Sequence, residues 1–352
     1  MKTTIFVFAG AALIAAGCAA IATGEDAALL ARAQQVFKPL PADAGTPQHP
    51  LGKDRVELGR VLFFEPRLSV DNRVSCATCH QPSFYGAEPL ALSVGIYGKV
   101  LPRNTPTIFN TALQFAQHYD GNRTDVEDQA PKALLSPFAY GNKDNGASLE
   151  RLRALPGYRP LFEKAFPGEG EPVSLENFAK AVGAYERVLL TPAPFDRYLK
   201  GDQAAIGVQA KRGLDTFMSV GCVGCHSGVL VGGQMYQKFG VTQDYWTLTG
   251  SKPNEVHKGI DPGRMFFTKN ESDRFMFKVQ QLRNVAVTPP YFHDGSVARL
   301  DDAVRIMGKL QLGRDLGTGE VSDIVAFLES LTGEVPAMFV NAPLAPVVAN
   351  PR

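Results

Sequence analysis

The sequence carries almost no net charge, few cysteines and few stretches that alternate like β-strands. Its 36 basic and 35 acidic side chains leave a formal charge of +1, which excludes a strongly basic nucleic-acid-binding protein. The apolar run from Ile5 to Ala16 is too short to cross a bilayer as a permanent helix. Hydrophobic residues make up 45% of the chain, enough for a globular core, and their spacing is mostly helical. We therefore expect a mainly α protein.

The amino end has the layout of a secretory signal. A basic Lys2 precedes the apolar run, and the small residues Ala15-Ala16-Gly17 stand directly before Cys18. Small residues before a cysteine are also typical of a lipoprotein signal, in which Cys18 is lipidated. Ala15 stands where that signal usually has leucine, so cleavage and lipidation stay open. Both interpretations of residues 1–18 place the protein in the periplasm, free or anchored to a membrane through Cys18.

The other four cysteines form two copies of one pentad, Cys-x-x-Cys-His. The copies are Cys76-Ala77-Thr78-Cys79-His80 and Cys222-Val223-Gly224-Cys225-His226. This is the attachment motif of a c-type haem, in which two thiols bond to the haem and the histidine reaches the iron. A zinc knuckle would not need a histidine directly after each cysteine pair, and a dithiol redox pair would not need it either. We therefore predict two covalently attached haems.

The helical pattern and the position of the pentads indicate two domains. The pentads stand about 145 residues apart, which fits one haem in each domain. We predict an N-terminal haem domain over 26–190, a C-terminal haem domain over 200–335 and an extended tail over 336–352, with the joint at Thr191–Pro194. Apolar spacing predicts helices over 56–63, 175–186, 209–218, 300–307 and 320–331.

The chain resembles the bacterial diheme cytochrome c peroxidase family, which also includes the diheme enzyme that matures the tryptophan tryptophylquinone cofactor. The similar strings lie at 57–63, 75–80, 102–107, 128–130, 174–177, 282–285, 290–296 and 303–308, so the resemblance covers about residues 50–335. It implies a mainly α-helical fold with two cytochrome c-like domains, one haem in each and a calcium ion near their interface.

The resemblance assigns different roles to the two haems. The C-terminal haem would accept electrons, with His226 and Met307 as its iron ligands, and the N-terminal haem on His80 would react with peroxide. Periodicity alone leaves a second interpretation for Met307, because Leu300, Val304 and Met307 share one helical face and could simply pack in the core. A thioether ligand raises the reduction potential of a haem, which suits the electron-accepting site.

Two positions near the N-terminal haem depart from the family's pattern. The family's removable distal histidine falls at Ile96, which cannot bind iron; the neighbouring Tyr97 is a less favoured substitute. Gln129 matches the family's distal glutamine, but the acid–base glutamate ten residues later falls at Ala139. Loss of such a group typically costs about 10²–10⁴ in rate. Tyr140, Gln129 or a water relay are the candidates to replace it.

Further site residues also come from the resemblance. Tyr119 falls where the family has a tryptophan between the haems, so it is either a stepping stone for electrons or a packed interdomain side chain. The calcium ligands would be Asn104, Thr288 and Pro290, completed by waters. Arg283 and His293 would contact haem propionates or orient ligands, with packing and surface roles as the alternatives.

These features predict a periplasmic peroxidase. It would reduce hydrogen peroxide with electrons from a small cytochrome c or cupredoxin, and a homodimer would be usual for the family. One alternative is an enzyme that uses peroxide to oxidise a partner protein or an organic substrate. A second is a non-catalytic electron carrier or sensor, which the missing glutamate favours and an open N-terminal haem argues against.

Overall fold

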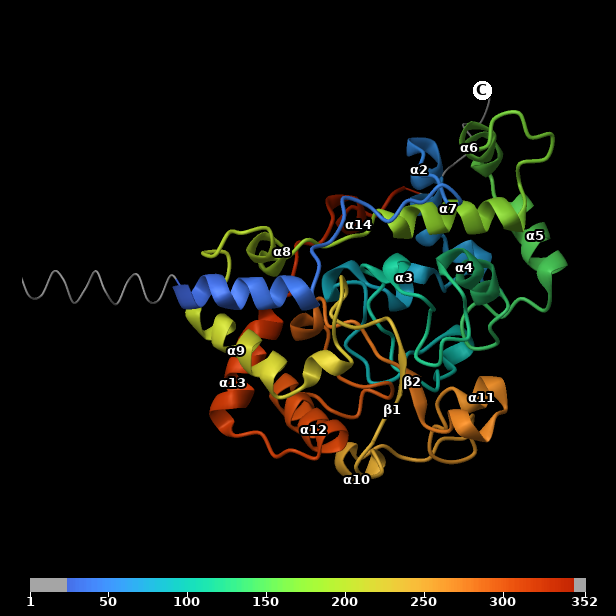
Figure 1. The fold of residues 1–352 in the computed structure, drawn as a ribbon. Helices are drawn as coiled ribbons and strands as arrows, with labels where there is room; N and C mark the ends of the chain where they lie inside the picture. The colour runs from blue at the N-terminus through green and yellow to red at the C-terminus, as the bar shows by residue number, and fades with distance from the viewer. Residues whose placement is uncertain (1–23, 345–352) are drawn as a thin grey trace, which may run out of the picture.

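The protein folds mainly into helices joined by long loops (Figure 1). The structure is a computed structural model that describes residues 24–344. The expected signal over 1–18, with Cys18, and the last residues of the tail lie outside that range. The sheet consists of two antiparallel strands, β1 (Tyr236–Lys238) and β2 (Met276–Lys278). The first helix covers residues 24–36. The other α-helices are α2 (Lys53–Phe63), α3 (Cys76–Cys79), α4 (Val126–Leu134), α5 (Asn145–Arg153), α6 (Tyr158–Ala165), α7 (Leu175–Arg187), α8 (Pro194–Leu199), α9 (Val208–Ser219), α10 (Trp246–Thr249), α11 (Met265–Thr268), α12 (Leu300–Leu312), α13 (Thr318–Glu329) and α14 (Ala337–Val340).

The expected helices are confirmed, some with longer bounds. Ser174 caps α7, because its side-chain oxygen accepts a hydrogen bond from the backbone N–H of Asn177 at 3.1 Å. α12 continues five residues past Met307, to Leu312, before Gly313 ends it in the left-handed region at φ 62°.

One hydrophobic core lies between α2, α4, α6 and α7 and holds the first pentad. α2 and α7 cross in close contact, and α4 also packs on α7. Leu58, Leu62 and Phe63 of α2 are buried against Phe178, Val182 and Tyr185 of α7, as their helical spacing requires. We call this the N-terminal core.

A second core lies between α8, α9 and α13 and holds the second pentad. α9 and α13 form its closest helix pair, with Leu214 and Phe217 packed against Ile324 and Phe327. Figure 1 shows the helix over residues 24–36 beside this group, and its Leu29, Ala33 and Phe37 are buried there. We call this the C-terminal core.

Both ends of the described chain cross to the opposite core, which differs from the expected segments. Residues from 26 were assigned to the N-terminal domain, but the first helix buries its apolar stripe in the C-terminal core. The tail from 336 was expected to be extended, but it forms the short helix α14, and Phe339 is fully buried against Phe63 and Phe109 of the N-terminal core. Burial of these apolar side chains explains both differences, since each contributes about 1.5–3 kcal/mol.

The joint at Thr191–Pro194 is a buried, hydrogen-bonded connection between the two cores. The Thr191 hydroxyl accepts hydrogen bonds from the side-chain amides of Asn110 at 2.9 Å and Asn284 at 2.8 Å. Directly beyond it, Asp196 receives both terminal nitrogens of the fully buried Arg283 at 2.8 and 2.9 Å. These bonds hold the two pentads in a defined relation to each other.

Within residues 24–344, no helix combines the length and the apolar character needed to cross a membrane.

Candidate haem sites

Each pentad forms one tight helical turn that presents two free thiols and a histidine. The first is α3 and the second a 3₁₀ turn over Cys222–Gly224, and the backbone N–H of each histidine donates to the carbonyl of the first cysteine at 2.9 Å. Burial raises the pKa of the Cys76 and Cys79 thiols to about 12 and that of Cys222 to about 11. Dithiol redox pairs need a lowered thiol pKa, so the surroundings of these cysteines argue against that alternative.

The two histidines are held in the same orientation. The Nδ1–H of His80 donates to the carbonyl of Gly86 at 2.9 Å, and that of His226 donates to the carbonyl of Val231 at 3.3 Å. Burial lowers the pKa of both imidazoles, that of His226 to about 4, so both stay neutral. A neutral ring with Nδ1 occupied leaves Nε2 as the metal-binding atom, which is the arrangement of a ligating histidine.

A glycine and a phenylalanine four residues later occur in the helix before each pentad. A Cβ on Gly59 of α2 would lie 1.9 Å from the carbonyl oxygen of Ala181 in α7, and a Cβ on Gly213 of α9 would lie 1.7 Å from that of Asp323 in α13. Only glycine allows these helices to approach so closely. Phe63 then lies with its ring centroid 6.5 Å from that of His80, and Phe217 lies 6.4 Å from His226. The visible signal of this repeat in the sequence is the Gly-x-x-x-Phe spacing at 59–63 and 213–217, which the patterns of apolar residues alone do not reveal.

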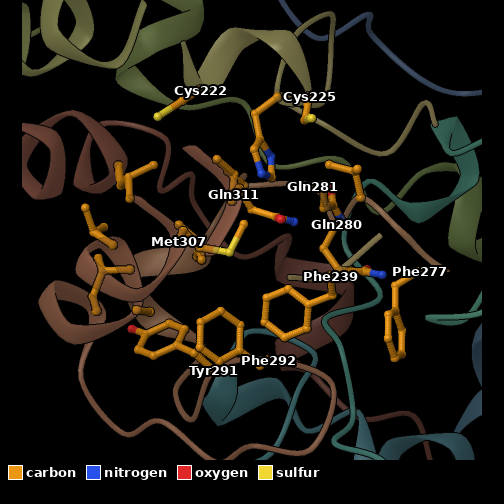
Figure 2. Close-up of a pocket in the computed structure, with 18 of the residues that line it drawn as sticks. Cys222, Cys225, Phe239, Phe277, Gln280, Gln281, Tyr291, Phe292, Met307 and Gln311 are labelled. Carbon is orange, nitrogen blue, oxygen red and sulfur yellow. The ribbon is translucent and has the colours of Figure 1, made fainter. Parts of the chain in front are cut away.

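The second pentad opens into a cavity of about 280 Å³ that Met307 also lines. Figure 2 shows the Met307 sulfur directed into this space from α12, with Cys222 and Cys225 on the opposite wall and the rings of Phe239, Tyr291 and Phe292 below. His226 lines the same cavity. The predicted ligands and both attachment thiols thus meet around one largely apolar space, which fits a haem held between His226 and Met307.

Gln129 and Tyr140 are the candidates to replace the acid–base glutamate expected near the first haem. The side-chain Oε1 of Gln129 in α4 is buried and has no hydrogen-bond partner among the described residues. Such an orphaned acceptor is costly unless a bound group supplies a donor, so Gln129 fits a ligand-binding role. The Tyr140 hydroxyl lies 3.2 Å from the Cys76 sulfur, at the edge of the expected haem. Burial raises the pKa of Tyr140 well above its usual value, which keeps the phenol protonated.

The two positions that depart from the family's pattern lie against each other. The backbone N–H of Ile96 donates to the carbonyl of Phe138 at 3.1 Å, and a Cβ on Gly141 would lie 2.2 Å from the Ile96 side chain. The Ile96 loop is therefore hydrogen-bonded to the loop that carries Ala139 and packs against it. Ile96 is buried, whereas Tyr97 is 71% exposed, an exposure that does not suit an iron ligand.

Tyr119 and the expected calcium ligands lie where the two cores meet. Tyr119, Asn104, Thr288 and Pro290 all line the Met307 cavity, and the Tyr119 hydroxyl donates to Asn104 Oδ1 at 3.4 Å. The Tyr119 carbonyl accepts a hydrogen bond from the backbone N–H of Lys278 in β2 at 2.7 Å. The structure thus brings these four residues together and places Tyr119 in direct contact with β2.

Comparison with known proteins identifies the family. The sequence profile described as "Di-haem cytochrome c peroxidase" matches residues 53–204. The cytochrome c551 peroxidase of Pseudomonas aeruginosa is 42% identical over 322 residues, covering 91% of this chain and 90% of its own. The chain belongs to the di-haem cytochrome c peroxidase family. The methylamine utilization protein MauG of Methylorubrum extorquens, 36% identical over 82% of this chain and 81% of its own, shares the superfamily.

Solved structures agree with this assignment. A MauG-like protein associated with microbial copper homeostasis is 26% identical, with a TM-score of 0.75 over 87% of this chain and 97% of its own. The diheme peroxidase BthA from Burkholderia thailandensis is 20% identical and shares the fold, with a TM-score of 0.66 over 88% of this chain and 92% of its own.

Two other side chains that the diheme peroxidase resemblance singled out are already engaged by protein groups. Arg283 is paired with Asp196, as described above, and its Nε donates to the Val229 carbonyl at 2.6 Å. His293 Nε2 faces Asp261 at 3.8 Å in a buried group around Arg103, which also pairs with Asp120 at 2.8 Å and with Asp261 at 2.7 Å. The structure favours the packing alternative for Arg283, whose charge is fully compensated.

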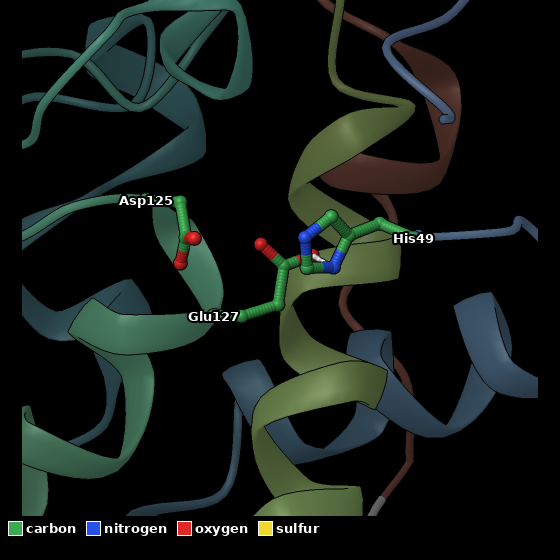
Figure 3. A group of neighbouring side chains, drawn as sticks. All are labelled: His49, Asp125 and Glu127. Atoms are coloured by element: carbon green, nitrogen blue, oxygen red, sulfur yellow. Dashed lines mark ion pairs between the residues drawn. The ribbon is translucent and has the colours of Figure 1, made fainter. Parts of the chain in front are cut away.

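A further group of ligand-type side chains lies outside the haem sites. Figure 3 shows His49, Asp125 and Glu127, whose ligand atoms lie within 4.8 Å of one another. Both Glu127 oxygens already accept from Arg187, at 2.7 and 2.8 Å, and an Asp125 oxygen caps α4. With its carboxylates occupied in this way, the group ties residue 49 to α4 rather than forming a metal site.

Proposed function

We propose that this protein is a periplasmic diheme peroxidase that reduces hydrogen peroxide to water with electrons from a small cytochrome c or cupredoxin. Cys76, Cys79 and His80 would hold one c-type haem, and Cys222, Cys225, His226 and Met307 the other, each in a cytochrome c-like domain. The observation that carries the proposal is the meeting of both thiols, His226 and Met307 around one cavity. The high identity to a cytochrome c551 peroxidase along nearly the whole chain supports it.

The haems would supply the electrons and the iron that binds peroxide, while the protein's own residues would position and protonate it. Gln129, with its unpartnered buried Oε1, would accept a hydrogen bond from the bound peroxide. The Tyr140 phenol, which burial keeps protonated, would donate a proton or a hydrogen bond near Cys76. Ile96 would keep protein ligands away from that face, so no ligand release would precede peroxide binding.

Tyr119 would carry electrons between the haems. It lines the Met307 cavity, yet it belongs to the N-terminal half of the chain. Burial raises its pKa, so the phenol remains protonated at rest. Asn104, Thr288 and Pro290 would hold calcium beside it, since an amide oxygen, backbone carbonyls and waters are suitable calcium ligands.

The proposal extends to location and assembly. The signal over residues 1–18 would export the chain, and Cys18 would provide a lipid anchor if it is acylated. A homodimer would match the usual form of the family. Size-exclusion chromatography and mass analysis of the mature amino end test these points directly.

Oxidation of a partner protein or organic substrate is a second candidate, and Ala139 favours it. Without a carboxylate at 139, the site lacks the group that would speed cleavage of the peroxide bond, whereas an open haem would still react. MauG and a MauG-like protein are both similar to this chain.

A steady-state assay with hydrogen peroxide and a reduced small cytochrome c tests the proposed function. We expect turnover above that of free haem, and Ala139→Glu should raise it by about 10–10², part of the usual acid–base contribution. Tyr140→Phe is the matched variant and should lower the wild-type rate while leaving Ala139→Glu active.

Absence of turnover in the wild type and in Ala139→Glu would contradict the peroxidase proposal. A long-lived oxidised state in the wild type that added aromatic compounds reduce would favour the second candidate. If that state is absent and peroxide is not turned over, an electron carrier or sensor is the remaining function.

A further inference from the structure

Two long cationic side chains, Lys278 and Arg283, line the Met307 cavity, and they differ in how their charge is balanced. Arg283 has Asp196 as a bidentate partner. Lys278 is only 3% exposed and forms no ion pair with any residue between 24 and 344. Its Nζ donates only to amide oxygens, to Gln114 Oε1 and, at 3.4 Å, to Gln280 Oε1.

A buried ammonium without an anion is costly, because amide oxygens replace only part of its hydration. Burial lowers the pKa of Lys278 to about 7, and the more distant Asp120 offsets this only in part. The backbone of this lysine is held in place, since β2 pairs Lys278 with Tyr236 and its N–H is bound to the Tyr119 carbonyl. A negative group entering the cavity would therefore find a fixed, uncompensated partner.

Gln280, which donates its amide to the Lys278 carbonyl at 3.1 Å, lies in the wall of the same cavity in Figure 2. Gln114 approaches Lys278 from the N-terminal half of the chain. Lys278 and Gln280, which both line the cavity, offer an ammonium and an amide to a carboxylate, and each haem carries two carboxylates on its propionates.

We propose that Lys278, flanked by Gln114 and Gln280, binds a propionate carboxylate of the haem attached at Cys222 and Cys225. This rests on the proposed haem attachment and deepens it, because Arg283, the propionate partner expected from the resemblance, is already neutralised by Asp196. The ammonium and the carboxylate compensate each other's charge in a low-dielectric site. Removal of the ammonium leaves a negative charge beside the haem, which favours the oxidised form.

The test is the reduction equilibrium of the Met-ligated haem, measured by optical redox titration of the holoprotein. Lys278→Met should shift the ferrous-to-ferric ratio at a given potential about tenfold toward ferric, equal to about 59 mV for a one-electron couple. Lys278→Arg should stay within about twofold of the wild type, because it keeps the charge. Lys278→Gln should repeat the shift and covers the case in which methionine disrupts the core.

Lys238→Met is the matched control, since Lys238 lies on the neighbouring strand β1 but is exposed, so solvent screens its charge. Three results overturn the assignment. The first is a shift of equal size in Lys238→Met, and the second is a shift confined to the other haem. The third is the absence of a shift in both Lys278→Met and Lys278→Gln. A haemochrome assay on the wild type separates the two proposals. Two covalent haems without a shift refute the role of Lys278 alone, while no haem on Cys222 and Cys225 refutes both.

Discussion

The close helix contact at Gly213 should be the most sensitive packing position in the C-terminal core. In Gly213→Ala the new methyl group would lie 1.7 Å from the Asp323 carbonyl oxygen, where an ordinary contact needs about 3.4 Å, so α9 and α13 must separate by roughly 1.7 Å. The Asp323 carbonyl belongs to the backbone and cannot rotate away as a flexible side chain could. Overpacking of this kind costs about 1–3 kcal/mol, and the better helix propensity of alanine returns at most about 1 kcal/mol. With that offset, we expect a net loss of up to about 2 kcal/mol.

Gly319→Ala in α13 is the matched control, because its Cβ would meet no atom within 4 Å. There the helix propensity acts alone, and stability should rise by about 0.5–1 kcal/mol. Denaturant unfolding of the holoprotein, followed by circular dichroism and by the absorbance of the haem proposed at Cys222 and Cys225, measures both variants. Because Phe217 packs on His226, Gly213→Ala should also perturb that absorbance before global unfolding. If the two variants were equally stable, the close contact would not constrain the fold and the reasoning would fail.

Three further variants probe the sites themselves. Met307→Leu should keep both haems and cost less than about 1.5 kcal/mol of stability. It should lower the reduction potential of the C-terminal haem in a redox titration, because a thioether ligand raises that potential. An unchanged potential would exclude Met307 as a ligand. Gln129→Leu should reduce peroxide turnover. The free energy of unfolding should not fall, because the substitution removes a buried acceptor that has no partner. Activity equal to that of the wild type would contradict the role of Gln129 in peroxide binding. Burial, and secondarily Glu127, raise the pKa of Glu186 to about 8. The folded state therefore binds the Glu186 proton more tightly than the unfolded chain does. As the pH rises from about 5 to 8 this proton is lost, and the free energy of unfolding falls. Glu186→Gln should therefore gain stability over the wild type across that pH range, and a parallel pH dependence of the two unfolding free energies would refute it.

Local patterns in the sequence were sufficient for the attachment groups and most long helices. The haem pentads are contiguous, so their thiols and histidine meet whatever the rest of the chain does. The helices around Leu58, Phe178 and Leu214 follow from apolar residues at helical spacing, and such spacing is itself local. Met307 is an intermediate case: its spacing allowed a core residue as well as a ligand, and its place in the cavity opposite Cys222 and Cys225 agrees with the ligand.

Contacts between distant segments could not be read in this way. Phe339 of the tail and Phe37 after the first helix each crossed to the opposite core, because an apolar side chain buries itself wherever a complementary surface exists. The partners of Arg283 and Lys278 had the same origin. Both are cations in the same stretch of chain, and only the fold paired one with Asp196 and left the other facing amides.

Chemistry that resides in neighbouring residues, namely the predicted haem attachment and the predicted iron-binding histidines, can therefore be read from the order of the amino acids, because a few bonds fix its geometry. Charge balance, the approach of Ile96 to the Ala139 loop and the gathering of Tyr119 with the cavity residues arise when segments that are distant in the sequence pack together. Burial then sets the electrostatic cost of each group, and burial is a property of the folded chain.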